Sequence, residues 1–412
     1  MRSSSTPNPH PVRNLEAIDG LCEDAGLARN PRGHAASVTR RRRFERASPE
    51  ALSQAAPIPR VAANGVQWLP VPGWERFHWL WHGFSTRRGG ESRAYCPDDA
   101  PGELNLGFTP EDSPETVALN RRLLAEALTG NRATPLVTLR QIHSNVVVVV
   151  RTQNAARVLL CKRGVPGDWS SSLGCKRGVP GDWSSSLGCK RGVPGDWSSS
   201  LGCKGGVPGD AEKGPNSSLG CKGDGLMTDQ PGLLLAVQTA DCIPVLVADR
   251  KRRAVAAFHA GWRGTVQRIV ESGVGRMRLE FGSRPEDLAA AIGPGIGACC
   301  YAVGEEVLSS FDSQFAYAHN LFREVCDADP VRAKYPMLFL TQRAPGHSPI
   351  GPSLHLDLAE ANRRQLLAAG LKPRSIQLVG GCTGCQPELF FSHRASRGHA
   401  GRMLSVIGIR PH

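Results

Sequence analysis

Three residues that can bind a metal ion lie at the ends of apolar segments of this sequence. His143 interrupts one apolar stretch, Cys242 follows a second, and His259 ends a third just before a glycine-containing turn. Strand ends that open into such turns are where α/β proteins present reactive side chains. Two imidazoles and a thiolate suit Zn²⁺ and leave a fourth position for water or substrate. The pattern therefore indicates a metal site that could activate a water molecule as a nucleophile.

Each of these residues also has a plainer interpretation. A buried cysteine usually packs as a small hydrophobic side chain, and a histidine at a strand end often only completes local hydrogen bonds. Asp241, beside Cys242, either supports the metal ligands and moves protons or is an ordinary surface or capping residue. Spacing alone leaves both interpretations open.

Other motifs carry weaker signals. Cys299-Cys300 and Cys382-x-x-Cys385 could be redox-active or bind metal, but neither has an evident partner pair, so we interpret them as structural thiols. The glycine-rich residues 293–297 could hold phosphate through backbone N–H groups. They lack the lysine and helix of a P-loop, which favours a tight turn.

The elements that must position these residues alternate between strand-like and helix-like segments. Apolar runs of strand length predict strands at residues 136–139, 145–151, 233–237, 243–248, 254–258, 376–379 and 403–409. Helices are predicted from Ser113-Pro114 to Gly130, from a cap at Thr265 with an apolar face reaching Met277, and from a capping box at Asp357 to Gly370. The alternation predicts a mixed α and β domain.

An internal repeat dominates the middle of the chain. The unit CKRGVPGDWSSSLG occurs three times without change over residues 161–202, and a diverged copy extends to residue 220. A unit rich in Gly and Ser buries too little apolar surface to offset its ordering entropy. We therefore expect residues 161–222 to form a flexible surface insertion. A metal-binding or redox array of these cysteines is the alternative, although zinc ligands usually come in pairs two to four residues apart.

The net charge of +13 invites a nucleic-acid interpretation. Residues 1–60, which include the run Arg40 to Arg43, contain ten arginines and six acids; residues 161–222 contain nine Lys or Arg and five acids. These two segments account for +8 of the total and leave +5 for the remainder. We interpret residues 1–60 as a disordered basic leader, and nucleic acid is not an expected partner.

Length and composition limit the class of protein. A chain of 412 residues, 40% of them apolar, can form one large domain or two ordinary domains. The first ten residues hold no apolar stretch of a secretory signal, and no run approaches the roughly 18 apolar residues of a membrane span. We therefore expect a cytoplasmic protein, without a membrane partner, whose 13 cysteines are mostly reduced.

Nine motifs, taken in order, resemble the laccase-domain or YfiH-type family. They are HGFSTRRGGES (82–92), RQIHS (140–144), GDGLMT (223–228), QTADCIPVL (238–246), HAGWRGT (259–265), GPGIGACCYAVGEEV (293–307), LDLAEANRRQL (356–366), CTGCQPELFFSHR (382–394) and GRM (401–403). The resemblance implies one catalytic domain over residues 61–412 with a layered α/β/β/α architecture, interrupted by the insertion at 161–222.

The resemblance also implies an activity and a set of site residues. Members of the family, first described as multicopper polyphenol oxidases, are regarded as purine nucleoside phosphorylases that also deaminate adenosine and cleave methylthioadenosine. By position, His143, Cys242 and His259 then look like the metal-binding and catalytic residues, with zinc as the ion and copper as the alternative. Arg87 looks like the substrate-binding arginine, since a guanidinium fork suits phosphate. Purine nucleosides and phosphate are the expected substrates.

This sequence departs from the family pattern in two ways. The repeat stretches the separation between His143 and Cys242 to 99 residues, and no family role attaches to Gly384 or Cys385. The segment Leu389-Phe390-Phe391 is expected in the core, although an aromatic ring of this segment could also stack on a purine.

Two other functions remain open. A copper polyphenol oxidase is one, because His and Cys also bind copper, but the sequence offers no His-x-His clusters. A non-enzymatic protein that binds nucleic acid through residues 40–43 and the lysines of the repeat is the other. His393 and Arg394 could face the site of an enzyme.

Overall fold

The computed structural model describes residues 44–47, 57–97, 99–151, 218–325 and 353–411. Most of the predicted leader, 1–60, and most of the predicted insertion, 161–222, lie outside these residues. The chain divides into two units, Met1–Arg43 and Phe44–His412, and everything described belongs to the second.

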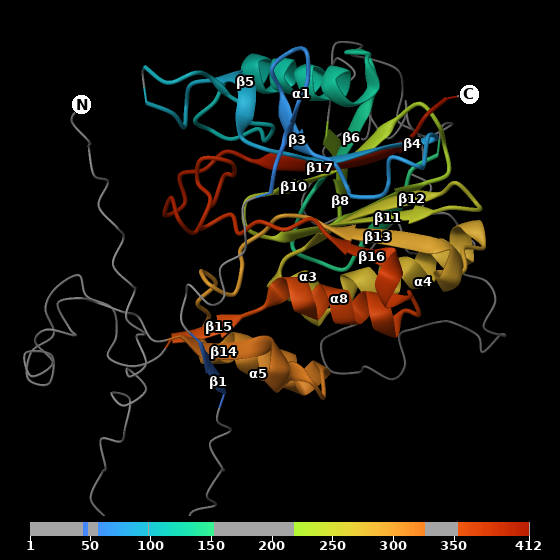
Figure 1. Cartoon of the computed structure of the whole chain (residues 1–412), viewed down its shortest axis with the longest axis vertical. Helices are drawn as coiled ribbons and strands as arrows, with labels where there is room; N and C mark the ends of the chain where they lie inside the picture. The colour runs from blue at the N-terminus through green and yellow to red at the C-terminus, as the bar shows by residue number, and fades with distance from the viewer. Residues whose placement is uncertain (1–43, 48–56, 98, 152–217, 326–352, 412) are drawn as a thin grey trace, which may run out of the picture. The chain divides into compact units, whose positions relative to one another are not determined.

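Two sheets stacked face to face form the centre of this unit (Figure 1). The seven-stranded sheet has the order β2 (Arg60–Val61), β3 (Gln67–Leu69), β4 (Leu80–Ser85), β17 (Met403–Ile409), β10 (Leu234–Thr239), β6 (Leu136–Arg140) and β8 (Ser218–Lys222). The six-stranded sheet has the order β16 (Ile376–Leu378), β13 (Leu288–Ile292), β11 (Ile243–Asp249), β12 (Val255–Ala260), β9 (Gly225–Thr228) and β7 (Val147–Val149). Strand β5 (Arg88–Ser92) lies outside both.

Helices cover the outer face of each sheet. Helix α1 (Pro114–Thr129) packs on β4 and β5, while α4 (Ile269–Phe281) and α8 (Leu358–Ala368) pack on β12 and β13. Short α3 (Trp262–Val266) joins β12 to α4. A small third sheet of β1 (Glu45–Ala47), β14 (Phe322–Val325) and β15 (Ser353–Leu356) lies beside α5 (Glu305–Gln314) (Figure 1). The layered α/β/β/α fold that the resemblance implies is confirmed.

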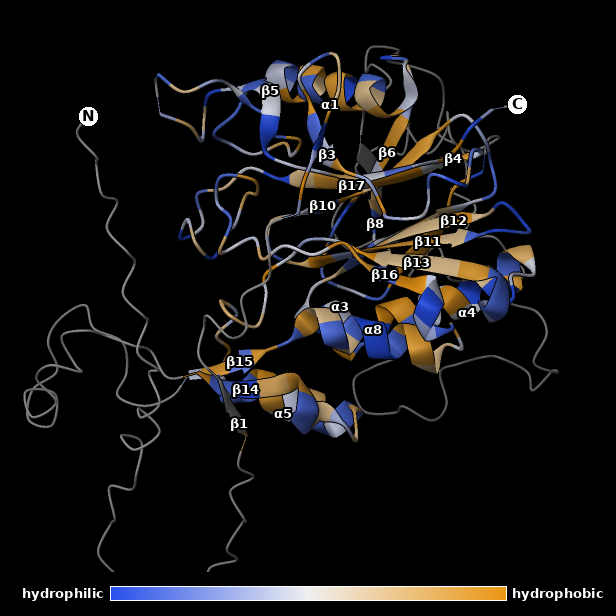
Figure 2. Ribbon diagram, viewed as in Figure 1, coloured by the Kyte–Doolittle hydropathy of each residue, from blue (hydrophilic) through white to orange (hydrophobic). Residues whose placement is uncertain are grey.

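Burial on both faces explains why β11 is apolar without interruption over residues 243–248. All seven residues of this strand are buried. Leu246 and Ala248 pack between the two sheets, whereas Val245 and Val247 pack in the core beneath the helices. A strand covered on both faces has no polar alternation. Figure 2 shows the result as apolar inner strands and polar outer faces on α4 and α8.

Most predicted elements are confirmed, with two differences among the strands. The strand predicted at 145–151 is confined to Val147–Val149, because β7 pairs with β9 only from Gly225 to Met227. The second difference is an additional strand, β8, formed by Ser218–Lys222, the last residues of the predicted insertion. That strand pairs in parallel with β6, with Thr138 opposite Ser218.

Helix signals at Ser113 and Asp357 are confirmed. The Ser113 hydroxyl accepts a hydrogen bond from the Thr116 N–H at 3.0 Å, and α1 ends at Gly130 with φ of 80°. The Asp357 carboxylate accepts the Glu360 N–H at 2.9 Å at the start of α8. These two caps satisfy N–H groups that a helix cannot satisfy internally.

The predicted helix cap at Thr265 is wrong. Thr265 lies within α3, which begins after Gly261, and α4 begins separately after Arg268. The Thr265 hydroxyl instead accepts a hydrogen bond from Asn362 Nδ2 of α8 at 3.1 Å. Its side chain therefore joins α3 to α8 rather than starting a helix.

Within the described ranges, none of the helices combines the length and the apolarity that crossing a membrane requires.

Two glycines of α4 allow a matched test of how this helix packs on β12. A Cβ atom at Gly273 would overlap the ring of the buried Phe258, whereas a Cβ atom at Gly275 would meet nothing within 4 Å. We expect Gly273→Ala to lower the free energy of unfolding by about 1–3 kcal/mol through overpacking. Gly275→Ala should raise it by up to about 1 kcal/mol through helix propensity. Denaturant titration measures both, and equal shifts of the same sign would contradict this packing.

Candidate metal centre

The structure brings His143, Cys242 and His259 together. One potential ligand atom from each side chain lies within 4.8 Å of the others. Cys242 Sγ is 3.8 Å from His143 Nε2, and the two imidazole rings are 4.9 Å apart between centroids. Ligand atoms about 2.0–2.3 Å from one tetrahedral ion must lie roughly 3.3–3.8 Å apart. The three side chains therefore need only small movements to bind one ion.

Sheet pairing places two of the three residues. Cys242 immediately precedes β11, and His259 lies near the end of β12. These strands are antiparallel neighbours, with Ile243 opposite Ala260 and Pro244 opposite His259. Register alone thus brings the thiol and the imidazole to the same end of the six-stranded sheet.

The turn after β6 supplies the third residue. His143 has a left-handed backbone, with φ of 58°, a conformation that is uncommon outside glycine but more accessible to His than to branched residues. It lets the N–H groups of Ile142, His143 and Ser144 converge on one acceptor, the carboxylate of Asp224. The turn is therefore held by an acid about eighty positions away in the chain.

Asp224 also orients the second histidine. Its Oδ1 accepts the His143 N–H at 3.0 Å and lies 2.9 Å from His259 Nδ1. Its Oδ2 accepts the Ser144 N–H at 2.6 Å and the Ser144 hydroxyl at 2.7 Å. Because Nδ1 of His259 donates to this carboxylate, Nε2 is left free to bind an ion.

Sequence reasoning gave Asp224 no role. The available signal was an acid between two glycines, Gly223 and Gly225, at the head of a buried apolar run. Asp224 itself has no exposed surface. A fully buried carboxylate is costly unless it is paired and hydrogen-bonded, so its position required several donors.

Electrostatics favour a thiolate at Cys242. Burial opposes ionisation, but the charge of His259 and hydrogen bonds with both imidazoles outweigh it and lower the Cys242 pKa to about 6. For His259, burial is likewise outweighed, here by the Cys242 thiolate and the Asp224 hydrogen bond, and its pKa rises to about 9. Burial of Asp224 is outweighed by hydrogen bonds from His259 and Ser144, which lower its pKa to about 2. At neutral pH these values give two anionic side chains beside a protonated His259. A metal ion that binds Nε2 of His259 would displace the proton on that nitrogen.

Gly261 leaves space for the three side chains. A Cβ atom at this position would lie 2.9 Å from Cys242 Sγ and 3.0 Å from His143 Cδ2. A side chain here would therefore press on both potential ligands.

Asp241 fixes the backbone next to Cys242. Its φ is 99°, outside the regions that most residues adopt. Its carboxylate accepts hydrogen bonds at 2.7 Å from the hydroxyls of Thr383 and Ser392 and from the N–H of Arg394. Of the two interpretations offered for Asp241, this contact pattern matches capping of a neighbouring loop, which in turn supports Cys242.

Arg87 lies between β4 and β5, with its charge already paired. Its guanidinium contacts Glu103 at 2.7 Å, donates to the Pro387 carbonyl at 2.6 Å and stacks over the Phe391 ring at 4.6 Å. Phe390 and Phe391 are buried, as predicted for core residues, and Leu389 is half-buried against the same core. A phosphate at Arg87 would have to compete with Glu103.

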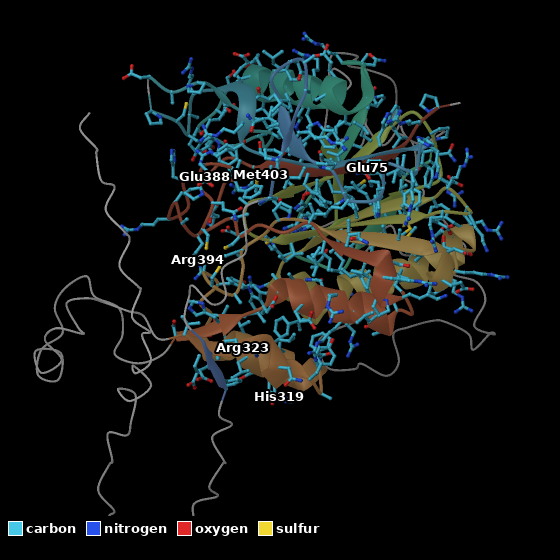
Figure 3. All side chains as sticks on the ribbon, in the orientation of Figure 1. Glu75, His319, Arg323, Glu388, Arg394 and Met403 are labelled. Atoms are coloured by element: carbon cyan, nitrogen blue, oxygen red, sulfur yellow. The ribbon has the colours of Figure 1, made fainter. Side chains whose placement is uncertain are left out.

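Two other arginines, Arg263 and Arg394, line a cavity of about 360 Å³, together with one acid, Glu306. Arg263 follows Gly261 by two positions and stacks on Trp262, and Arg394 lies over the ring of Tyr301. Arg394, labelled in Figure 3, belongs to the loop bound to Asp241. In the described parts of the chain, no acidic side chain forms an ion pair with either arginine. Sequence reasoning pointed to Arg394 but missed Arg263.

Comparisons with known proteins find one matching family and several similar proteins. The family described as "Multi-copper polyphenol oxidoreductase laccase" matches residues 81–169 and 207–410. A protein named purine nucleoside phosphorylase from Deinococcus radiodurans is 32% identical over 80% of this chain and 88% of its own length. Another of that name from Bacteroides thetaiotaomicron is 40% identical, but over 45% of this chain and 60% of its own length. A prokaryotic protein of unknown source named adenosine deaminase RL5 is 33% identical over 45% of this chain and 61% of its own length.

Solved structures show the same fold. YlmD from Geobacillus stearothermophilus matches with a TM-score of 0.56 and 28% identity, covering 86% of this chain and 100% of that one. YfiH from Bacillus licheniformis matches with a TM-score of 0.56 and 27% identity, covering 85% of this chain and 99% of that one.

Replacing Asp224 tests its hold on the metal-binding group. We expect Asp224→Asn to weaken zinc binding about 10–100-fold, because an amide cannot accept all the hydrogen bonds that orient His143 and His259. Competition with a chromophoric chelator measures this affinity. Asp249→Asn is the matched control: Asp249 is also buried and also accepts backbone N–H groups, from Lys251 and Arg252, at the far end of β11. Equal zinc affinity in the wild type and Asp224→Asn would contradict the role of Asp224.

Proposed function

The chain belongs to the multi-copper polyphenol oxidoreductase laccase family, and we propose that it is a purine nucleoside phosphorylase that also deaminates adenosine. Its proposed nucleosides are adenosine, inosine and methylthioadenosine, with phosphate as the second substrate. The names of several relatives support this proposal. The observation that carries it is the group of His143, Cys242 and His259, whose ligand atoms lie within 4.8 Å of one another.

The chemistry of these three side chains suits Zn²⁺. Two imidazoles and a thiolate are typical zinc ligands, and three protein ligands leave a position for a reacting molecule. The exposed side of His143 provides the access. When bound, the ion would supply Lewis acidity that makes a nucleophile available at neutral pH. We therefore propose these residues as both the metal-binding and the catalytic group.

We further propose contacts between residues of this chain and the parts of a nucleoside. Trp262 and Tyr301 line the cavity, each with an arginine over its ring. We propose that the purine base packs against these two side chains. Burial raises the pKa of Tyr301 to about 12, so its hydroxyl remains a hydrogen-bond donor at neutral pH. Asp224 keeps the proton on Nδ1 of His259 and so fixes which nitrogen faces the reacting group.

We propose that Arg263 and Arg394 bind the phosphate. Both line the same cavity as the aromatic side chains, and a guanidinium gives a phosphate two parallel hydrogen bonds. Arg87 remains a second candidate for this role. Arg87 forms a salt bridge to Glu103, whose side chain is only 6% exposed. Arg87 is therefore less available to bind phosphate than Arg263 and Arg394 are.

Steady-state kinetics distinguish the two phosphate candidates. We expect Arg263→Ala to raise the KM for phosphate about 10-fold or more, since a charge-assisted hydrogen bond contributes about 1.5–3 kcal/mol. Arg276→Ala, which removes an exposed arginine of α4 paired with Glu280, should leave this KM unchanged. If Arg87→Ala raises the KM while Arg263→Ala does not, phosphate binds at Arg87 instead.

Product analysis tests the proposed activity itself. We expect metal-replete protein incubated with adenosine and phosphate to form adenine and ribose 1-phosphate by phosphorolysis and inosine by deamination. Chelator treatment should stop both reactions because the ligand group then lacks its ion, and Cys242→Ser should lose bound metal and turnover together. Absence of all these products from metal-replete protein would refute the proposal.

A copper polyphenol oxidase is the second candidate function. The family description names this activity, and two histidines with one cysteine are also the ligand set of blue-copper sites. Within the described residues, however, the second group of potential metal ligands contains cysteines and no histidine. A blue absorption on copper loading, together with oxidation of phenols, would favour this function over the first.

A further inference from the structure

Four cysteines outside the His/Cys/His centre lie together in space. They are Cys299, Cys300, Cys382 and Cys385, and their sulfur atoms all lie within 4.8 Å of one another. Cys385 Sγ is 3.3 Å from the Sγ atoms of both Cys299 and Cys300. The sequence showed no evident partner pair for either cysteine pair. That interpretation is wrong, because the two pairs lie against each other in the structure.

Two tight turns present these sulfurs to each other. In the first, the N–H groups of Cys300 and Tyr301 both donate to the Gly297 carbonyl at 3.0 Å. In the second, the Cys385 N–H donates to the Cys382 carbonyl at 3.2 Å. A bridge between Gly295 and Cys382, with the Thr383 N–H donating to the Gly295 carbonyl at 3.0 Å, joins the turns. The backbone thus fixes the arrangement without a covalent link.

We propose that Cys299, Cys300, Cys382 and Cys385 bind one Zn²⁺ ion, at a site separate from His143, Cys242 and His259. Zinc bonded to four sulfurs at about 2.3 Å in a tetrahedron separates the sulfurs by about 3.8 Å. The observed separations, from 3.3 Å to at most 4.8 Å, bracket this value. A tetrahedral set of four thiolates selects zinc or iron among common metals, and zinc needs no redox partner.

The surroundings of Cys382 fit a thiolate, and glycines leave space for the sulfurs of Cys299 and Cys300. The Gly297 N–H donates to Cys382 Sγ at 3.1 Å, and Cys382 has no exposed surface. A Cβ atom on Gly297 would lie 3.1 Å from Cys299 Sγ, and one on Gly384 would lie 3.1 Å from Cys300 Sγ. Each turn therefore has a glycine where a sulfur needs the space.

A disulfide explains these contacts less well. A disulfide bond is about 2.05 Å long, and Cys385 lies equally far, at 3.3 Å, from two possible partners. One bond would leave two of the four thiols without a partner of their kind, whereas one ion engages all four.

This site would position Cys242 of the other centre. Thr383, between Cys382 and Cys385, donates its hydroxyl to the Asp241 carboxylate at 2.7 Å. The Ile296 N–H, from the segment before Cys299, donates to the Asp241 carbonyl at 2.8 Å. Since Asp241 directly precedes Cys242, both segments bound by the ion hold the backbone that carries that thiol.

The direct test leaves the four cysteines unaltered. Full-length Cys242→Ser protein, purified after growth with zinc, should contain one zinc per chain by elemental analysis. X-ray absorption at the zinc edge should show four sulfur neighbours at about 2.3 Å. Protein without zinc, a zinc shell containing nitrogen, or a disulfide among these four cysteines in peptide mapping would each overturn the proposal. None of these measurements depends on turnover, so the proposed nucleoside chemistry can fail independently.

Variants count the two sites separately. We expect two zinc ions per chain in the wild type, one in Cys382→Ser/Cys385→Ser and none when Cys242→Ser is added. Cys96→Ser, which removes a free cysteine outside both groups, should retain two. A zinc ion that persists in the triple variant would show that the bound metal lies elsewhere in the chain and would contradict the four-cysteine site.

Discussion

The site depends on the hydrogen bonds that the buried carboxylate of Asp224 accepts. It accepts hydrogen bonds from the turn that follows β6 and from the His259 ring on β12, while its own backbone carbonyl accepts the His259 N–H at 2.7 Å. The turn extends from the seven-stranded sheet, and β12 belongs to the six-stranded sheet. The Asp224 side chain therefore holds the turn after β6, from the seven-stranded sheet, against β12 of the six-stranded sheet. A buried charge is tolerated here because several N–H groups, a hydroxyl and an imidazole donate hydrogen bonds to it.

A second aspartate, Asp241, supports the backbone of Cys242, the third potential metal ligand. His143 and Asp241 both have positive φ angles, 58° and 99°, and such conformations cost about 1–3 kcal/mol each. Hydrogen bonds to charged groups contribute about 1.5–3 kcal/mol, and each of these residues lies among several of them. The two loops are thus held in conformations that they would not adopt alone. His259, within a regular strand, needs no such strain. The site is preorganised by carboxylates that are not themselves proposed as ligands.

Sequence patterns predicted the parts of the molecule that depend on local physics. The buried strands, the caps at Ser113 and Asp357, and the strand-end placement of His143, Cys242 and His259 follow from apolar runs and turn residues near each position. Long-range partners were beyond such patterns. Asp224 binds N–H groups some eighty residues away, Thr265 is engaged by Asn362 of another helix, and the cysteine pairs meet across 86 positions. Similarly, nothing local indicates that Glu103 pairs with Arg87. Tertiary contacts decided each of these cases.

The most direct test of the account is anomalous diffraction from crystals of the zinc-loaded protein. We predict a zinc peak bounded by Nε2 of His143, Sγ of Cys242 and Nε2 of His259, with Nδ1 of His259 still bonded to Asp224. This result would show that the carboxylate orients the ligands of one shared ion. A His143 side chain turned away from the ion, or a His259 bound through Nδ1 with Asp224 displaced, would contradict the account.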